Sequence, residues 1–245
     1  MATQSKAQFI ADILALLKKR YHAEPSPERL SVLEAVVYGI CHEDVPRARA
    51  VEALASFQSN FFDWNELRVS SLAEIQKTLE GIPGAEERAT RIRRFLRQLF
   101  EKTYGFNLDA QAKKPQKEAV KAFEDYEAFA SDYILATATR LSLGGHAIPV
   151  DASMHRALDR LGIAEPGMDA ATLRSTLERA VPKARGTEFA DLIEELAHDT
   201  CVPGEPDCPR CELQAVCPTG KARLANLPTS KAPKARAVKS KAPEA

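Results

Sequence analysis

Four cysteines near the end of the sequence restrict what this chain can fold into more than any other feature. They lie within one short segment, separated by six, two and five residues: Cys201, Cys208, Cys211 and Cys217. Four thiolates can bind zinc or an iron–sulfur cluster. Zinc ribbons usually carry two Cys-x-x-Cys pairs far apart, whereas only Cys208 and Cys211 have that spacing here. Prolines and Gly204 also keep the segment out of regular structure, as a loop wrapped around a cofactor requires.

The distribution of apolar residues along the sequence favours a location in a reducing compartment. The chain has 245 residues, 44% hydrophobic and 28% charged, and no apolar stretch approaches the length of about eighteen residues that spans a membrane. The N-terminal segment 1–22 is an amphipathic helix by its spacing, not a signal peptide. We therefore expect a cytoplasmic location, where clustered thiols hold metal more often than they form disulfides. The fifth cysteine, Cys41, lies in an apolar segment and is expected in the core.

Apolar residues recur at helical spacing almost throughout, so the predicted fold class is all-α. About ten helices are expected, and no segment shows the alternation of a strand. The main predicted helices cover residues 9–17, 27–42, 47–57, 71–84, 85–105, 127–143, 151–162, 169–181 and 187–199. Residues 110–123 are predicted to interrupt this series.

The charge is unevenly distributed along the chain. Residues 218–245 carry seven lysines or arginines and one glutamate, which leaves residues 1–217 with 27 basic and 33 acidic residues and a net charge of minus six. The tail is rich in Ala, Pro and Lys without apolar periodicity, so it is predicted to be disordered. Such a tail can contact nucleic acid through phosphates, or it can act only as a solubilising segment.

The cysteine spacing resembles the iron–sulfur loop of the endonuclease III group, which are DNA base-excision glycosylases of the helix–hairpin–helix superfamily. The preceding stretch "LIEELAHDTC" resembles the helix that leads into that loop. The resemblance covers residues 8–218 and implies a structural [4Fe–4S] cluster on the four cysteines. It also implies a two-lobed all-α fold: residues 1–27 packing on the cluster lobe, 28–144 as a helical barrel with a degenerate hairpin, 145–220 as the lobe of the catalytic Asp and the cluster, and 221–245 as the basic tail.

The stretch "HAIPVDASMHRALDRLG" is similar to the family segment that carries the essential Asp, and Asp151 falls on that position, with Arg156 on a family Arg. A carboxylate there can stabilise the carbocation-like sugar or activate water when a glycosidic bond breaks. Asp151 is also a natural N-cap for the helix that follows, worth about 1 kcal/mol. His155, one turn further on, is a candidate for orienting a water.

The chain departs from the family at the amine nucleophile and at the hairpin. The position of the family's lysine, eighteen residues before Asp151, is occupied by Tyr133, and a phenol cannot form a Schiff base. The hairpin glycines are replaced by Phe129 and Ser131, and acidic residues surround them, which disfavours positive φ and phosphate binding. Cys41 stands where the family has a glutamine that probes the space left by the flipped base.

The turn "GIPGAEERA" resembles the family's DNA-contacting loop, which makes Gly84, Arg88 and Arg91 candidate contacts to DNA. The resemblance thus implies a monomer that binds double-stranded DNA, associates with the nucleoid and is a monofunctional glycosylase. A second hypothesis is a non-catalytic iron–sulfur module that binds DNA or responds to redox state. A third is a zinc-bound scaffold with other partners.

Overall fold

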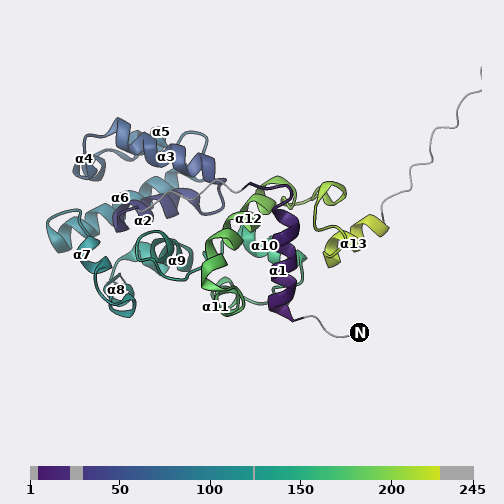
Figure 1. The fold of residues 1–245 in the computed structure, drawn as a ribbon. Coiled ribbons are helices and arrows are strands. Elements are labelled where there is room, and N and C mark those ends of the chain that lie inside the picture. Colours follow the sequence, from purple (N-terminus) through teal and green to yellow (C-terminus); the bar gives the residue numbers. More distant parts are fainter. Residues whose placement is uncertain (1–4, 23–29, 124, 227–245) are drawn as a thin grey trace, which may run out of the picture.

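In the computed structural model, which describes residues 5–22, 30–123 and 125–226, helices form two lobes, each around its own core (Figure 1). The barrel lobe comprises residues 30–123 and 125–143, and the cysteine lobe comprises residues 5–22 and 145–226. No strand occurs in these ranges, so the all-α prediction is confirmed for the described part of the chain. None of the described helices is long and apolar enough to cross a membrane.

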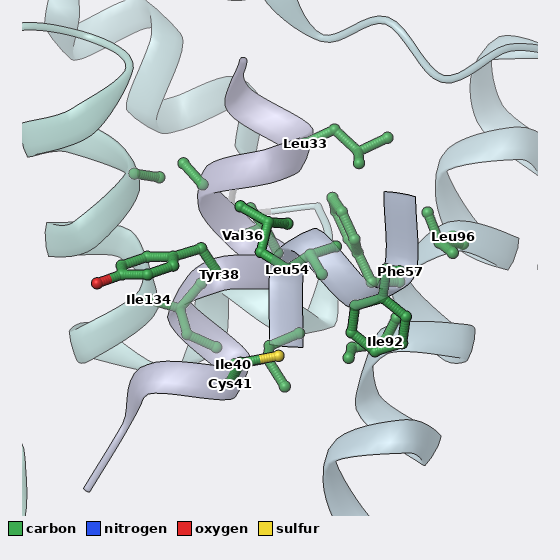
Figure 2. Close-up of a cluster of buried hydrophobic side chains, with 14 of the residues drawn as sticks. Leu33, Val36, Tyr38, Ile40, Cys41, Leu54, Phe57, Ile92, Leu96 and Ile134 are labelled. Carbon is green, nitrogen blue, oxygen red and sulfur yellow. The ribbon is translucent and has the colours of Figure 1, made fainter. Parts of the chain in front are cut away.

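The barrel lobe is built around one central helix, α2 (Val32–His42). Ser31 starts α2 with a capping box, in which Ser31 and Glu34 satisfy each other's backbone N–H groups. Ten of the eleven residues of α2 are buried, and Figure 2 shows Val36, Ile40 and Cys41 among the side chains of neighbouring helices. The other helices of the barrel lobe are α3 (Arg47–Asn60), α4 (Trp64–Val69), α5 (Leu72–Thr78), α6 (Ala85–Thr103), α7 (Asp109–Ala112), α8 (Gln116–Phe123), η1 (Glu127–Ala130, a 3-10 turn) and α9 (Asp132–Leu141), of which α3, α6 and α9 contact α2.

The cysteine lobe combines the first described helix with the last ones. Buried residues of α1 (Lys6–Leu17) belong to the same core as those of α12 (Gly186–Asp199), although the two helices are far apart in sequence. The other helices are α10 (Ala152–Arg160), α11 (Ala170–Ala180) and α13 (Pro218–Ala225), with 3-10 turns at Lys183–Arg185 and Cys208–Arg210.

Some element boundaries differ from the prediction. The helix predicted over 127–143 is broken at Ser131, whose side chain caps α9 by accepting from the backbone N–H of Ile134. Residues 110–123, which were predicted to interrupt the helices, contain most of α7 and all of α8. Pro115 does not prevent α8, because it directly precedes this helix, where its missing N–H costs nothing. The short helix α4 was not expected, and it begins at Asp63, which caps it.

The predicted tail begins too early at residue 221. Helix α13 extends to Ala225, with Pro218 in its first turn and Cys217 at its N-cap. Residues 227–245, which hold the rest of the predicted basic tail, lie outside the described residues.

Candidate active site and cysteine loop

A small pocket lies where the two lobes meet, because side chains from both of them line it. The enclosed space has room for about one water molecule. The lining residues are His42, Tyr133, Arg140, Pro149, Asp151, Ser153, Met154, Ala190, Glu194, Ala197 and His198. The predicted site residues Asp151 and Tyr133 are therefore brought together in one pocket.

Asp151 is the N-cap of α10 and also connects the lobes. Its Oδ1 accepts from the backbone N–H of Met154 at 2.7 Å, and its Oδ2 accepts from that of Asp44 at 3.0 Å. Asp44 returns the contact, since its Oδ1 accepts from the backbone N–H of Ser153 at 2.8 Å. Burial raises the pKa of Asp151, and these N–H groups oppose the rise only in part. The result is a fixed carboxylate that is more basic than a solvent-exposed one.

Tyr133 is joined to the cysteine lobe through His42. The hydroxyl of Tyr133 lies 2.9 Å from Nδ1 of His42, and Nε2 of His42 lies 2.8 Å from Oε1 of Glu194. His42 and Tyr133 come from α2 and α9, whereas Glu194 comes from α12. Burial raises the pKa of Tyr133 well above its ordinary value, with nearby Asp151 and Glu194 adding to the rise, so the phenol stays protonated.

Behind this pair lies a buried network of charged side chains that fastens the lobes together. Arg47 donates to Glu194 at 2.6 Å and to Asp191 at 2.7 Å, and Arg140 donates to the same Asp191 oxygen at 3.1 Å. Burial alone would raise the pKa of Glu194, but His42 and Arg47 outweigh it and lower the pKa to about 2. Glu194 is therefore a carboxylate at neutral pH.

Removing the charge of Asp191 is expected to destabilise the protein by about 3–5 kcal/mol, because it would leave Arg47 and Arg140 without a shared buried counter-ion. Urea unfolding of Asp191→Asn measures this cost. The matched control is Glu52→Gln, which removes the exposed Arg49–Glu52 pair and should change stability by less than about 1 kcal/mol. Equal effects of the two substitutions would contradict the structural role assigned to the network.

The degenerate hairpin forms without the backbone geometry that glycine provides. Neither Phe129 nor Ser131 has a positive φ. Phe129 points into the barrel core and stacks on Phe123, with ring centroids 4.7 Å apart. The acidic residues near the turn have internal partners: Glu127 pairs with Arg94, and Asp132 forms a two-pronged ion pair with Arg174 of the cysteine lobe at 2.7 and 2.8 Å. The segment predicted as a degenerate hairpin therefore forms a turn that needs no glycine at Phe129 or Ser131.

The three predicted DNA contacts lie together at the N-terminal end of α6. Gly84 has φ of +68°, which a glycine adopts without strain. Arg88 donates to the backbone carbonyls of Pro83, Ile40 and Glu43, so it joins the turn to the end of α2. Arg91 forms an ion pair with Glu43 at 2.8 Å and remains partly exposed. A wide hollow beside them is lined by Gly84, Arg91, Arg94, Glu127 and Ser131, among others.

Two residues of the Asp151 helix point elsewhere. Nε2 of His155 lies 2.8 Å from the backbone carbonyl of Met168, and His155 is not among the residues that line the pocket. Arg156 donates to the carbonyls of Ala197 and Cys201, which ties α10 to the end of α12. The histidine beside Asp151 is instead His198, whose Nε2 is buried without a hydrogen-bond partner among the described residues. Burial lowers the pKa of His198, which favours the neutral ring.

His42, Glu194 and His198 go beyond the sequence prediction. The available signal was the four-residue spacing of Glu194 and His198 in "LIEELAHD", which places both on one face of α12. His42 carried no such signal, because it stands at an ordinary helix end.

The four loop cysteines line one pocket in the cysteine lobe, together with Arg160, Leu196 and Leu213. All four are free thiols. Backbone N–H groups of Leu213 and Gly220 lie 3.4 and 3.3 Å from the sulfurs of Cys211 and Cys217, and Nη1 of Arg160 lies 3.6 Å from that of Cys201. Three of the four sulfurs therefore have an N–H donor nearby, one from the loop, one from α13 and one from α10.

The four thiols around one pocket are the type of donor set that a zinc ion or an iron–sulfur cluster uses. No three metal-binding side chains of the described residues are gathered tightly enough to hold one ion as they stand. A four-iron cluster is larger than one ion and is gripped by thiolates that lie further apart around a shared cavity. Burial raises the pKa of Cys208, and the nearby Cys217 and Cys201 raise it further. A raised pKa favours the protonated thiol, so only a cationic group bound among these sulfurs would hold them as thiolates.

The chain has the helix–hairpin–helix fold of the endonuclease III-like DNA glycosylases. A structure of endonuclease III in a non-covalent complex with DNA covers 91% of this chain and 100% of its own, with a TM-score of 0.71 and 17% identity. The match to the structure of a thermostable thymine-DNA glycosylase covers 89% of this chain and 97% of the glycosylase, with a TM-score of 0.62 and 18% identity. The match to the H. pylori 3-methyladenine DNA glycosylase bound to 1,N6-ethenoadenine covers 78% of this chain and 97% of that glycosylase, with a TM-score of 0.59 and 12% identity. No protein-family model and no curated protein matches the sequence.

Proposed function

We propose that the chain is a monofunctional DNA glycosylase that removes a damaged or mismatched base from double-stranded DNA. The observation that carries this proposal is Asp151, a partly buried and fixed carboxylate with a raised pKa in a pocket between the lobes. The shared fold with solved DNA glycosylases supports the class of reaction. Breaking the C1′–N bond leaves a sugar with carbocation character, and a negative charge held beside it lowers the barrier.

The contacts of Asp151 suit this electrostatic role. Each carboxylate oxygen accepts from one backbone N–H group, so the charge is held in position before the substrate arrives. A flipped base is much larger than a water molecule, so DNA binding must widen the pocket as the nucleotide enters.

Tyr133 closes the route that would cut the DNA strand. A lyase needs an amine that forms a Schiff base with the sugar. The described residues that line the pocket include no lysine, and the sequence resemblance puts Tyr133 at the position of the family's lysine. The expected product is therefore an abasic site in an intact strand.

We propose that the duplex meets the protein as a monomer at the N-terminal end of α6. Gly84 allows the backbone there to approach a phosphate, and the exposed part of Arg91 can contact one. Arg88 supports this turn from within through its three carbonyl contacts. We propose that the protein is cytoplasmic and associates with the nucleoid, because its DNA substrate lies there.

We further propose that Cys201, Cys208, Cys211 and Cys217 hold a [4Fe–4S] cluster. When bound, the cluster supplies a covalent crosslink of the loop and a site that can exchange an electron. The four cysteines belong to the loop between α12 and α13. Arg160 of α10 donates to the sulfur of Cys201 and to the backbone carbonyl of Val202 in this loop.

The activity is tested by incubating the protein, brown if it carries the cluster, with a panel of duplexes. The panel carries oxidised pyrimidines, uracil, alkylated purines, and G·T and A·8-oxoguanine mispairs. We expect one class of duplex to be cut only after alkali treatment, because base removal leaves an alkali-labile site. Cleavage without alkali would contradict the monofunctional assignment. No cleavage of any duplex would instead favour the non-catalytic module, and a colourless protein with stoichiometric zinc would favour the zinc-bound scaffold.

A further inference from the structure

Three side chains in the core between the lobes form a continuous hydrogen-bonded line: Tyr133, His42 and Glu194. We propose that they act together as the general base of base excision, with Tyr133 passing the proton of the attacking water to His42. This inference rests on the proposed glycosylase function and adds to it the group that accepts the proton. It also divides the chemistry between two parts of the pocket, since Asp151 then supplies charge.

The direction of the hydrogen bonds follows from the chemistry of Glu194. A carboxylate only accepts, so Nε2 of His42 must donate to Oε1 of Glu194 across their 2.8 Å contact. In a neutral imidazole the other nitrogen, Nδ1, then carries a lone pair. The hydroxyl of Tyr133, 2.9 Å away, therefore donates to Nδ1. The lone pairs of the phenol oxygen remain available to a water in the pocket.

The side chains around His42 hold it in this orientation. On α2 the ring of Tyr38 lies against it, with centroids 4.9 Å apart. From α12, Glu194 is kept ionised and in place by Arg47 of α3, which donates to its second oxygen at 2.6 Å. The remaining ionisable groups at this pocket are Asp151 of α10, Arg140 of α9 and His198 of α12. A base fixed by an oriented carboxylate is the arrangement that activates hydroxyl groups in hydrolytic triads.

Asp151 is less suited to receive the proton. Both of its oxygens already accept from backbone N–H groups, and protonation would remove the charge at the stage when the sugar cation needs it. Tyr133 and His42 can accept a proton without this loss. The imidazolium that forms is stabilised by Glu194, with which it makes an ion pair.

The step balances without any further reactant. The C1′–N bond breaks, and its electron pair leaves with the base. Water bonds to C1′ through oxygen and gives one proton to the phenol oxygen of Tyr133, whose own proton moves to Nδ1 of His42. The proton on His42 then returns along the same line and is taken up by the departed base. The products are the free base and an abasic sugar with a hydroxyl at C1′.

The test uses the full-length protein and the duplex that the panel identifies. Single-turnover rates of base release and duplex dissociation constants are measured for wild type, Tyr133→Phe, His42→Gln and the double variant. We expect each single variant to react about 10²-fold more slowly with unchanged duplex affinity. The double variant should be no slower than the singles, because the residues act as a unit. Tyr126→Phe, a buried phenol in the barrel core, should keep the wild-type rate.

The pH profile separates a relay from a structural role. In the wild type the relay acts beside Asp151, so the rate should fall more steeply with acidity than in Tyr133→Phe and His42→Gln, in which Asp151 acts alone. Melting curves and the visible absorption of the cluster show whether each variant is folded, and Tyr133→Phe loses only one oxygen atom.

Wild-type rates in Tyr133→Phe would overturn the relay, and so would multiplicative losses in the double variant or an unchanged pH slope. Each of these results leaves the proposed function standing, because the wild type is active. An inactive wild type would instead overturn the proposed function and the relay with it.

Discussion

Replacing Asp151 with asparagine is expected to lower the single-turnover rate of base release by about 10²- to 10⁴-fold. The substitution keeps the size of the side chain and an oxygen that can cap α10, so the helix should still begin at residue 152. It removes the negative charge that we assign to the sugar cation. A rate close to that of the wild type would remove Asp151 from the mechanism.

The same substitution has an expected signature in stability. Burial raises the pKa of Asp151 in the folded protein, so the folded state holds the proton more tightly than the unfolded state. The contribution of Asp151 to stability is therefore largest below the unfolded pKa of about 4 and is lost as the pH rises through the folded pKa. Asparagine does not titrate. The stability of Asp151→Asn relative to the wild type should accordingly rise with pH over this window.

Urea unfolding at several pH values between acid and neutral conditions measures this relative stability. The matched control is Asp169→Asn, which changes the exposed cap of α11. The Asp169 pKa is lowered by hydrogen bonds from Thr172, so the relative stability of this control should fall as the pH rises. A falling trend for Asp151→Asn would mean that the carboxylate is stabilised by the fold, contrary to the environment described above.

If the four cysteines hold the cluster proposed above, replacing Cys208 with serine is expected to remove it and weaken the cysteine lobe. The visible absorption and the iron content should be lost together, because one of four thiolates is missing. A structural metal contributes on the order of 10 kcal/mol to the segment that it binds. Even a loss of about 4 kcal/mol would lower the melting temperature by roughly 8–16 °C.

Cys41→Ala provides the control for this experiment. Cys41 is fully buried in the barrel core, where burial raises its pKa to about 12, so it is a neutral packing residue. This variant should keep its full iron content and lose only about 1 kcal/mol of stability. A full iron content in Cys208→Ser, or iron loss in Cys41→Ala, would contradict the assignment of the loop.

The features that follow from local pattern could be predicted from the sequence. Apolar periodicity indicated the helices, and the Asp before "ASMHRALDRLG" indicated both a cap and an acid. The split of the predicted helix at Ser131 could not be foreseen, because the apolar spacing continues across it and only the capping contact marks the break. Helices α7 and α8 are short and polar, which hides them from a periodicity argument.

The contacts between the lobes were beyond prediction for a different reason. His42 and Glu194 are 152 residues apart in sequence, and Arg47 and Asp191 are 144 apart. Each of these residues alone reads as an ordinary surface charge or helix end. Their burial becomes evident only when the two lobes meet, and the partner of each charge is supplied by the opposite lobe.

The cysteine lobe is built from segments on either side of the barrel lobe in the sequence. This division affects the order in which the parts of the protein can fold during synthesis. During synthesis the barrel lobe emerges as a continuous segment and can begin to fold at once, since domains generally fold as units. Helix α1 leaves the ribosome before the barrel lobe, yet its packing partners in α12 come some 170 residues later. An apolar face of α1 must therefore wait through most of translation. Insertion of the proposed cluster can only follow the synthesis of the cysteine loop, so the apolar face of α1 needs protection until α12 has been made.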